Sequence, residues 1–297
     1  MVIPCKDIAS KIQTELKNSA AQLLERGVSL KLVDILIGDS AAQDSYVRIK
    51  ARKAENVGAE FELIRLPSNT SQDELVGILE EKSADPSVTG IIIQQPFPPH
   101  FNPQELFQAI PFEKEIEGHK PGSTFLMPIA LSVLTAIKWL ANEKLEQKYT
   151  PLQSALVNLA VDAPLINQFL RGKNIVILGR GPTGGAPVAK AFDKLGVSYT
   201  QIHSQTENPD SITLHADIII SAVGKKILNK ENLKPGVVLL NLGLHHDGEK
   251  LMGDYAEDEV ESVASYHTQT PGGLGPIDVL YLYANLIEAA KKSSGFA

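Results

Sequence analysis

The chain has 297 residues, 43% of them hydrophobic and 21% charged, which is enough for two hydrophobic cores of ordinary size. Its 28 Lys and Arg against 35 Asp and Glu give a net charge of −7 without a long block of like charge, so we expect no nucleic-acid partner. The single cysteine excludes an internal disulfide, and because no Cys/His cluster has zinc-ligand spacing, we expect a reducing cytoplasm and no metal site.

The N-terminal residues form an amphipathic pattern, with apolar Ile8, Ile12 and Leu16 among polar residues. This pattern is unlike the apolar core of a signal peptide. No apolar run elsewhere approaches the roughly 20 residues that span a bilayer. We therefore expect a cytoplasmic protein without a membrane segment.

From Leu30 onward, short β-branched runs alternate with longer helical patterns, which is typical of βαβ units and a parallel sheet. In the first half we predict strands over residues 32–37, 61–66 and 90–93. The helices between them carry their own boundary signals, namely Gly58 as a C-terminal cap, Ser71 as the start of a capping box, and Asn102 as an N-cap before a proline.

A second series of strands and helices begins after Gly172. We predict strands over residues 175–178, 197–203, 217–222 and 237–242, a helix over 187–195 and a last helix from 276 to about 291. The predicted fold class is α/β with two domains, residues 1–127 and 171–275, the second of Rossmann type. A helical linker is expected over residues 128–170.

One segment has the pattern of a dinucleotide site: Gly179-Arg180-Gly181-Pro182-Thr183-Gly184 matches G-x-G-x-x-G directly after a predicted strand and before a helix. Glycines let the backbone approach a pyrophosphate, and the helix N-terminus offsets its charge. The alternative interpretation is a glycine-rich turn without a ligand.

The end of the next strand distinguishes NADP from NAD. It carries His203-Ser204-Gln205-Thr206, with no carboxylate for a ribose hydroxyl before Glu207, which favours NADP. Arg180 and Ser204 are then candidates for binding the 2′-phosphate, Arg180 through a charge-assisted pair. A solvated surface arginine is the alternative for Arg180.

Three further features are candidates for substrate chemistry. Tyr46 and Lys50 are four residues apart on a predicted helix and share one face, as a proton-transfer pair or as a packed ring beside a surface amine. Gln94 follows a predicted parallel strand, at the edge where open α/β sheets bind ligands, although it also suits a loop cap. The loop of residues 270–276 is rich in Gly and Pro, so either a ligand approaches its backbone or it is a rigid connector.

Taken in order, six segments resemble the bifunctional methylenetetrahydrofolate dehydrogenase/cyclohydrolase family, and together they span most of the chain. The segments are Tyr46-Val47-Arg48-Ile49-Lys50, Gly90-Ile91-Ile92-Ile93-Gln94-Gln95-Pro96, Lys114-Glu115-Ile116-Glu117-Gly118, Gly179-Arg180, His203-Ser204 and Pro271-Gly272-Gly273-Leu274-Gly275-Pro276.

This resemblance implies a homodimer of two-domain subunits, in which the helix of residues 276–297 returns to the first domain. It also implies that the protein catalyses two reactions. The first is NADP-dependent oxidation of 5,10-methylene-tetrahydrofolate to the methenyl form, and the second is hydrolysis of that form to 10-formyl-tetrahydrofolate. Lys50 would be the catalytic lysine, Tyr46 would orient the pterin, Gln94 would hydrogen-bond Lys50, and Glu117 would bind the pterin. The resemblance also implies a substrate loop of Pro271, Gly272 and Gly273, and cofactor contacts from Gly179, Arg180, Gly181, Gly184, Gly185, Ser204 and Leu244.

The chain also departs from the family pattern. The usual Pro-Cys-Thr-Pro segment is replaced by Met127-Pro128-Ile129-Ala130-Leu131, and a longer stretch than usual follows it. Four single positions differ as well: Glu117 and Asn241 each replace an aspartate, Gly181 a serine, and Asp278 a threonine. Two alternatives therefore stay open, an NADP oxidoreductase acting on another small substrate and a catalytically inactive folate- or nucleotide-binding relative.

Overall fold

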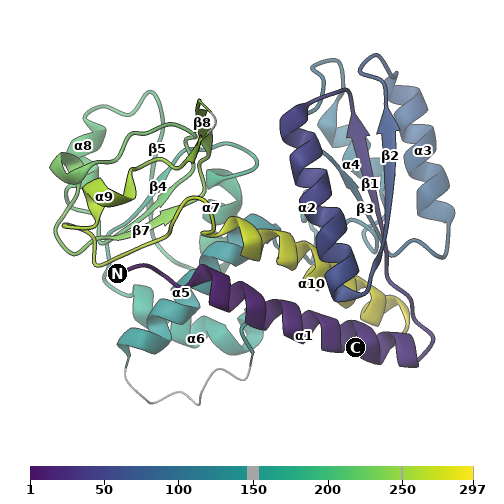
Figure 1. Ribbon diagram of the computed structural model, residues 1–297, viewed down its shortest axis with the longest axis horizontal. Helices are drawn as coiled ribbons and strands as arrows, with labels where there is room; N and C mark the ends of the chain where they lie inside the picture. Colours follow the sequence, from purple (N-terminus) through teal and green to yellow (C-terminus); the bar gives the residue numbers. More distant parts are fainter. Residues whose placement is uncertain (146–153, 249, 297) are drawn as a thin grey trace. The chain divides into compact units, whose positions relative to one another are not determined.

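The computed structural model describes residues 1–145, 154–248 and 250–296, with the side chains of residues 41 and 42 left out (Figure 1). The chain divides into two compact units, here called the first unit (Gln13–Met127 with Val279–Ala297) and the second unit (Met1–Ile12 with Pro128–Asp278). Residues 1–12 and the expected linker of residues 128–170 thus group with the second α/β series. Residues 146–153 of that linker lie outside the described residues.

The first unit contains a parallel sheet of three strands in the order β2-β1-β3. The strands are β1 (Lys31–Ile37), β2 (Glu60–Leu66) and β3 (Gly90–Ile93), and the helices that follow them are α2 (Ala41–Val57), α3 (Gln72–Ala84) and α4 (Pro103–Ala109) (Figure 1). The two N-caps and the C-cap are confirmed, whereas of the predicted capping box at Ser71 the structure shows the N-cap hydrogen bond. Gly58 is left-handed with φ of 89°, and the side chains of Ser71 and Asn102 accept backbone N–H groups at the starts of α3 and α4.

The two faces of strand β1 differ in chemistry. Val33, Ile35 and Ile37 pack into a core with residues of α3 and α4. Because side chains alternate along a strand, Leu32, Asp34 and Leu36 face the opposite side, and all three are fully buried. The Asp34 carboxylate therefore lies on a fully buried face of the sheet.

Helix α10 (Gly275–Ser293) supplies buried residues to the first unit from Val279 onward. A Cβ built on Gly90 of β3 would lie 2.8 Å from both Ile116 Cδ1 and Leu286 Cδ1, so a larger residue would have to displace these two side chains. The Asn285 amide donates to the carbonyl oxygens of Ile116 at 2.7 Å and Leu126 at 3.2 Å. These contacts fix the segment that carries Glu117.

The second unit contains a parallel sheet of five strands in the order β10-β7-β6-β4-β5. Its elements are α5 (Pro128–Lys144), α6 (Leu159–Leu170), β4 (Ile175–Leu178), α7 (Gly185–Leu195), β5 (Thr200–Ile202), α8 (Pro209–Thr213), β6 (Ile218–Ser221), η1 (Lys230–Asn232), β7 (Val238–Asn241), the hairpin β8 (His245–Asp247) and β9 (Lys250–Met252), α9 (Glu257–Val260) and β10 (Tyr266–His267). Helix α1 (Cys5–Glu25) begins in this unit and ends in the first.

Strand β5 is shorter than the predicted strand of residues 197–203. Gly196 is left-handed, with φ of 66°, and the Val197 N–H still closes the end of α7 by donating to Phe192 O at 2.9 Å. The first predicted strand residues therefore belong to the helix cap and its connection. Within the described ranges, no helix has the length and hydropathy to cross a membrane.

A buried ion pair joins α5 to α6. Lys138 Nζ lies 2.8 Å from Asp162 Oδ2, with the side chains 7% and 11% exposed, and it also donates to Leu156 O at 2.8 Å. We expect Asp162→Ala to lower the free energy of unfolding by about 3–5 kcal/mol, because it leaves a buried ammonium without its counter-charge. Urea unfolding measures this loss, and a change below about 1 kcal/mol would contradict the prediction.

Candidate active site

Lys50 lies on α2, partly exposed, with Tyr46 one turn earlier on the same face and 46% exposed. Two carboxylates, those of Asp34 and Glu117, interact electrostatically with the Lys50 ammonium. All four residues belong to the first unit. The predicted lysine thus interacts electrostatically with two acids, of which the sequence analysis named one.

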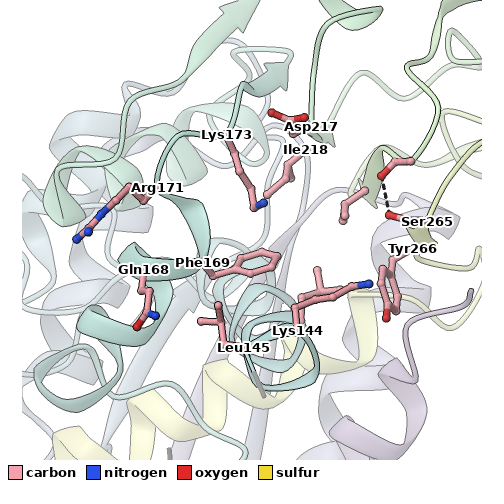
Figure 2. Close-up of a pocket in the computed structure, with 13 residues that line it drawn as sticks. Lys144, Leu145, Gln168, Phe169, Arg171, Lys173, Asp217, Ile218, Ser265 and Tyr266 are labelled. Atoms are coloured by element: carbon pink, nitrogen blue, oxygen red, sulfur yellow. Dashed lines mark hydrogen bonds between the residues drawn. The ribbon is translucent and has the colours of Figure 1, made fainter. Parts of the chain in front are cut away.

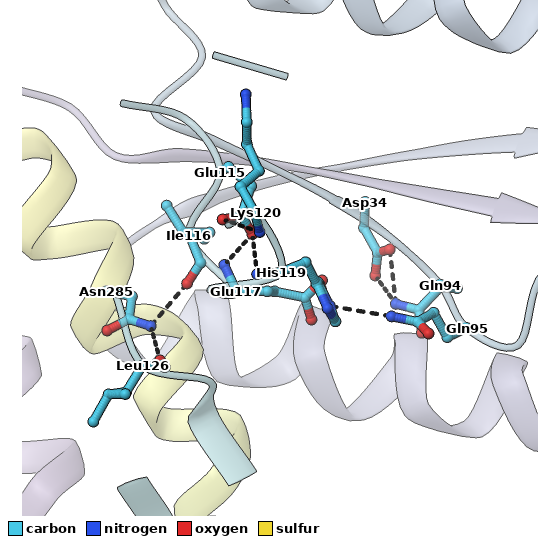
Figure 3. Close-up of polar contacts among 10 residues, drawn as sticks. All are labelled: Asp34, Gln94, Gln95, Glu115, Ile116, Glu117, His119, Lys120, Leu126 and Asn285. Atoms are coloured by element: carbon cyan, nitrogen blue, oxygen red, sulfur yellow. Dashed lines mark hydrogen bonds and ion pairs between the residues drawn. The ribbon is translucent and has the colours of Figure 1, made fainter. Parts of the chain in front are cut away.

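The side chain of Gln94 contacts Asp34 and not Lys50. Gln94 Nε2 donates to both carboxylate oxygens of Asp34 at 2.7 Å, and Figure 3 shows the amide directed at this carboxylate. The expectation that Gln94 hydrogen-bonds Lys50 is therefore wrong in the described part of the chain. The physical reason is that Gln94 extends β3 beside β1, and its side chain meets the acid on the neighbouring strand first.

Asp34 is fully buried, and burial raises its pKa above the ordinary aspartate value. The Lys50 charge and the Gln94 hydrogen bond act in the opposite direction, while the Glu117 charge adds to the increase. A charged residue within the apolar run Lys31-Leu32-Val33-Asp34-Ile35-Leu36-Ile37 was the sequence signal that could have identified it.

Glu117 is brought to the site by strand-like pairing of its segment with β3. Ile91 pairs in parallel with Glu115, so Glu117 comes two residues later, beside the carboxyl end of β3. The buried Glu115 carboxylate accepts the N–H groups of Glu117 and His119, each at 3.1 Å, which fixes the turn. Backbone pairing thus places Glu117 beside the carboxyl end of β3.

His119 stabilises the ionised form of Glu117. Burial acts to raise the pKa of Glu117, but its hydrogen bond with His119 and the Lys50 charge outweigh burial, and the pKa lies below the ordinary value. His119 Nε2 lies 3.5 Å from Glu117 Oε2 and 3.1 Å from Gln95 Nε2 (Figure 3). The His119 ring also stacks on Phe107, with the ring centroids 4.3 Å apart. The site therefore presents a carboxylate that stays ionised.

The backbone of Lys50 is held by a residue that the sequence analysis did not single out. The buried Tyr283 of α10 donates its hydroxyl to the Lys50 carbonyl oxygen at 2.6 Å. Burial and the Asp34 charge both raise the pKa of this phenol, so it stays protonated and keeps donating. A tyrosine in an apolar helix carries no sequence signal for this contact.

The dinucleotide loop has the close approaches that the glycine pattern predicts. Gly179 has φ of +100°, and a Cβ on it would lie 2.6 Å from Ala222 O. A Cβ on Gly184 would lie 2.9 Å from Ala222 Cβ, and one on Gly185 only 2.0 Å from Gly179 O. Gly181 differs, because its Cβ would meet no atom within 4 Å. Three glycines thus serve the fold of the loop, and Gly181 borders open space.

Arg180 and Ser204 occupy equivalent places on adjacent strands. Leu178 of β4 pairs with Ile202 of β5, and each candidate follows its strand by two residues, exposed to solvent. Leu244, 38% exposed, follows β7 at the same carboxyl edge of the sheet. Exposed donors at this edge, beside the start of α7, fit a dinucleotide with a 2′-phosphate.

The loops around this edge are held by two buried polar residues. Asp254 is fully buried and accepts the N–H groups of Val223 and Gly224 at 2.8 Å each. Asn241 accepts the Asp254 N–H at 2.9 Å and donates to Thr270 Oγ1 at 3.1 Å. An amide at position 241 can donate and accept here, which links the loop after β7 to the loop of residues 270–276.

The predicted substrate loop, with Pro271, Gly272 and Gly273, belongs to the second unit. Gly272 has φ of +97°, and a Cβ on Gly273 would lie 2.4 Å from Gln269 O, so both positions require glycine. Pro271 is exposed, and Asp278 lies in the first turn of α10. The tight backbone of this loop agrees with its Gly and Pro content.

A cavity of about 490 Å³ lies at the opposite edge of the second sheet (Figure 2). Its lining includes Lys144 at the end of α5, together with Lys173 and Asp217 just before β4 and β6, and no residue assigned to a site by the sequence. Lys144 lies over the Tyr266 ring, and Asp217 pairs with Lys234 at 2.5 Å. Lys173 lies over the Phe169 ring, so these three charges already have partners, and we assign the dinucleotide to the carboxyl edge.

Comparison with known protein families covers both units. The model described as tetrahydrofolate dehydrogenase/cyclohydrolase, catalytic domain, matches residues 3–117, and the model for the NAD(P)-binding domain of the same family matches residues 163–294. Bifunctional protein FolD of Exiguobacterium sibiricum is 34% identical over 293 residues, which cover 98% of this chain and 99% of that protein. The same protein of Brevibacillus brevis is 33% identical, with coverage of 99% and 98%.

Solved structures agree with this assignment. The bifunctional enzyme FolD from Campylobacter jejuni has a TM-score of 0.85 and 28% identity, covering 99% of both chains. The Trypanosoma brucei enzyme, complexed with NADP cofactor and inhibitor, has a TM-score of 0.78 and 27% identity, covering 99% of this chain and 98% of that one. The chain therefore belongs to the tetrahydrofolate dehydrogenase/cyclohydrolase family.

Proposed function

We propose that this protein oxidises 5,10-methylene-tetrahydrofolate to 5,10-methenyl-tetrahydrofolate with NADP and hydrolyses the methenyl form to 10-formyl-tetrahydrofolate. The observation that carries this proposal is the electrostatic interaction of Lys50 with the carboxylates of Asp34 and Glu117, in a chain whose two halves match both domains of the family. Family membership supports the substrate class, and the retained lysine supports catalysis over binding alone.

In the oxidation step, the protein mainly positions the substrate and the dinucleotide. NADP, when bound, supplies the hydride acceptor. Gly179, Gly181, Gly184 and Gly185 let the loop backbone and the α7 N-terminus approach the pyrophosphate, since a side chain at three of these positions would collide with neighbouring atoms. Leu244 would contact the cofactor from the loop after β7, a strand that is separated from β4 by β6 in the sheet.

The preference for NADP rests on two side chains. Arg180 would pair with the 2′-phosphate through its guanidinium, and Ser204 would donate a hydrogen bond to the same group. Both side chains are exposed just after the paired strands β4 and β5. The loop after β5 has no carboxylate before Glu207 that could accept a hydrogen bond from a ribose hydroxyl. NADP therefore suits this edge better than NAD.

In the hydrolysis step, Lys50 Nζ would exchange a proton with the water that attacks the methenyl carbon. Tyr46 would stack on the pterin and orient it. The ionised Glu117 carboxylate would accept hydrogen bonds from the amino-pyrimidine edge, and the backbone of Pro271, Gly272 and Gly273 would contact the substrate. Gln94 acts on Lys50 through Asp34, given the two hydrogen bonds it donates to that residue.

An absorbance assay tests the proposal. Purified protein is mixed with 5,10-methylene-tetrahydrofolate and either NADP or NAD, and reduced cofactor and methenyl product are followed. We expect turnover with NADP, followed by decay of the methenyl absorbance faster than in buffer. Folate binding without turnover would instead indicate an inactive relative, and absence of folate binding would indicate an oxidoreductase of another substrate.

Arg180→Ala tests the origin of the cofactor preference. We expect the KM for NADP to rise about 10- to 100-fold, because one charge-assisted hydrogen-bonding partner is lost, while the KM for NAD changes less than threefold or so. Steady-state kinetics with both cofactors measure the ratio. An equal increase for NAD and NADP would show that Arg180 does not bind the 2′-phosphate.

We further propose a cytoplasmic homodimer. The single cysteine, Cys5, is buried, and burial raises the pKa of its thiol to about 12, so it suits a protein that needs no disulfide. The family resemblance implies the dimer. Light scattering coupled to gel filtration distinguishes a dimer from a monomer of 32.1 kDa.

A further inference from the structure

Strand β7 ends with Asn241 at the carboxyl edge of the second sheet, where the side chain is buried and 4% exposed. The Asn241 amide makes three hydrogen bonds. Its Nδ2 donates to Gly243 O at 2.8 Å and to Thr270 Oγ1 at 3.1 Å, and its Oδ1 accepts the N–H of Asp254 at 2.9 Å. Both hydrogens of the amide nitrogen are therefore used, together with one lone pair of the oxygen.

The partners of this amide fix the direction in which it faces. A carbonyl such as Gly243 O only accepts and a backbone N–H such as that of Asp254 only donates, so the nitrogen and oxygen of the amide cannot exchange places. Gly253 leaves room for the amide, because a Cβ there would lie 2.7 Å from Asn241 Nδ2 and 2.8 Å from Thr270 Oγ1. A carboxylate of the same size would have no hydrogen for Gly243 O.

The same network reaches the dinucleotide loop within the second unit. The Asp254 carboxylate accepts the N–H groups of Val223 and Gly224 at 2.8 Å each. Ala222, the residue before them, borders the dinucleotide loop, since a Cβ on Gly179 would lie 2.6 Å from Ala222 O. Short contacts thus connect the dinucleotide loop, the loop after β6 and the amide at the end of β7.

We infer that Asn241 is a positioning residue that holds the cofactor loop after β7 and the substrate loop of residues 270–276 in one fixed arrangement. The hydrogen bond to Gly243 O fixes the backbone just before Leu244, and the one to Thr270 Oγ1 fixes the start of the substrate loop. Asn241 acts through these loops, because its amide nitrogen has no hydrogen left for a ligand. This inference rests on the proposed function, which assigns the first loop to NADP and the second to folate.

Asn241→Asp tests the hydrogen bond to the cofactor loop. The carboxylate still accepts the Asp254 N–H and can accept the Thr270 hydroxyl, but it cannot donate to Gly243 O. We expect the Kd for NADP at pH 8 to rise about tenfold, while the KM for 5,10-methylene-tetrahydrofolate changes less than about threefold. Calorimetric titration of NADP in the absence of folate measures the first value, and steady-state kinetics measure the second.

The pH dependence of this variant separates positioning from a merely structural role. A protonated carboxyl at position 241 again has a hydrogen for Gly243 O, and burial raises the pKa of a carboxyl. The ratio of variant to wild-type Kd for NADP should therefore fall toward one between pH 8 and pH 5. In the described part of the chain, the titratable groups whose hydrogen bonds reach this network are Asp254, Tyr255 and Glu257, and they are the same in both proteins.

The hydrogen bond to the substrate loop is tested by two substitutions of the half-buried Thr270. Thr270→Val keeps the shape but removes the hydroxyl, and Thr270→Ser keeps the hydroxyl. We expect Thr270→Val to raise the KM for 5,10-methylene-tetrahydrofolate about 3- to 10-fold and to change the Kd for NADP less than about twofold. Thr270→Ser should restore the wild-type KM.

Asn232→Asp is the matched control. The Asn232 amide is also buried, donates to Ile227 O at 3.0 Å and Asp210 Oδ1 at 3.1 Å, and accepts the Asn229 N–H at 3.0 Å. It lies outside the carboxyl-edge loops, at the end of η1. Its substitution should lower the melting temperature and leave the NADP affinity and the folate KM close to wild type.

The outcomes distinguish the inference from the proposed function. A wild-type protein without turnover contradicts the proposed function, and the NADP titrations then still test Asn241. Wild-type NADP affinity in Asn241→Asp at pH 8 overturns the inference, as does a loss that is equal at pH 8 and pH 5 or that Asn232→Asp shares. If Asn241→Asp does not fold, equal folate affinities in Thr270→Val and Thr270→Ser overturn it.

Discussion

Lys50→Met is expected to abolish methenyl hydrolysis, with a loss of about 100- to 10,000-fold, while NADP binding stays close to wild type. Methionine keeps the length and the apolar stem of the lysine but has no proton to exchange. The close contacts of the dinucleotide loop are made with Gly179 and Ala222, which the substitution does not touch. The expected result is an enzyme that accumulates the methenyl product.

The measurement compares decay of the methenyl absorbance with reduction of NADP in the same preparation. Lys53→Met is a matched control, because Lys53 lies on the same helix but donates to Gln13 Oε1 at 2.7 Å. Hydrolysis should survive in the control. Undiminished hydrolysis in Lys50→Met would remove Lys50 from its proposed role and shift attention to the remaining acids, Asp34 and Glu117.

The elements of the fold could be predicted where local signals decide the structure. β1, β2 and β3 lie within one residue of the predicted ranges, and the cap residues Ser71 and Gly58 act as their positions in the sequence indicated. β4 matches its predicted range, and α7 begins at Gly185, two residues before its predicted start. In each case the deciding contact is between residues close in sequence, which is where pattern reasoning is strongest.

Elements that depend on distant contacts could not be predicted. β10 has two residues and exists because it pairs with β7. Residues 128–170 were expected to be helical, but the bounds of α6 were not predicted, because α6 contains Pro164, a residue that disfavours a helix by propensity. Asp162, in the first turn of that helix, is buried only because Lys138 reaches it from α5. None of these features has a periodicity of its own.

The candidate site likewise contains residues that local sequence signals identify and residues that only distant contacts bring together. Lys50, Tyr46 and Gln94 could be named from sequence, but the hydrogen-bond partner of Gln94 could not, since it lies 60 residues away on β1. Tyr283, which holds the Lys50 carbonyl, is 233 residues from it. Chemistry-bearing residue types are visible in a sequence, whereas the residues that orient them come from whichever elements the fold brings alongside.

Gly185→Ala is expected to weaken NADP binding by about 100-fold or more and to lower the melting temperature. The added Cβ would lie 2.0 Å from Gly179 O and 2.7 Å from Gly179 C, so the backbone of either the loop or the α7 N-terminus must move. A displacement near 1 Å at a binding backbone is enough for a loss of this size. Titration of NADP in the absence of folate measures the affinity directly.

Gly181→Ala is the matched control, because its Cβ would meet no atom within 4 Å. Its melting temperature should equal that of wild type. Any change in NADP affinity in this control then reports on space that the cofactor itself occupies, whereas the loss in Gly185→Ala reports on the shape of the loop. Wild-type affinity in Gly185→Ala would mean that the pyrophosphate does not depend on the close approach of Gly179 to the start of α7, and the assignment of the cofactor to this loop would be wrong.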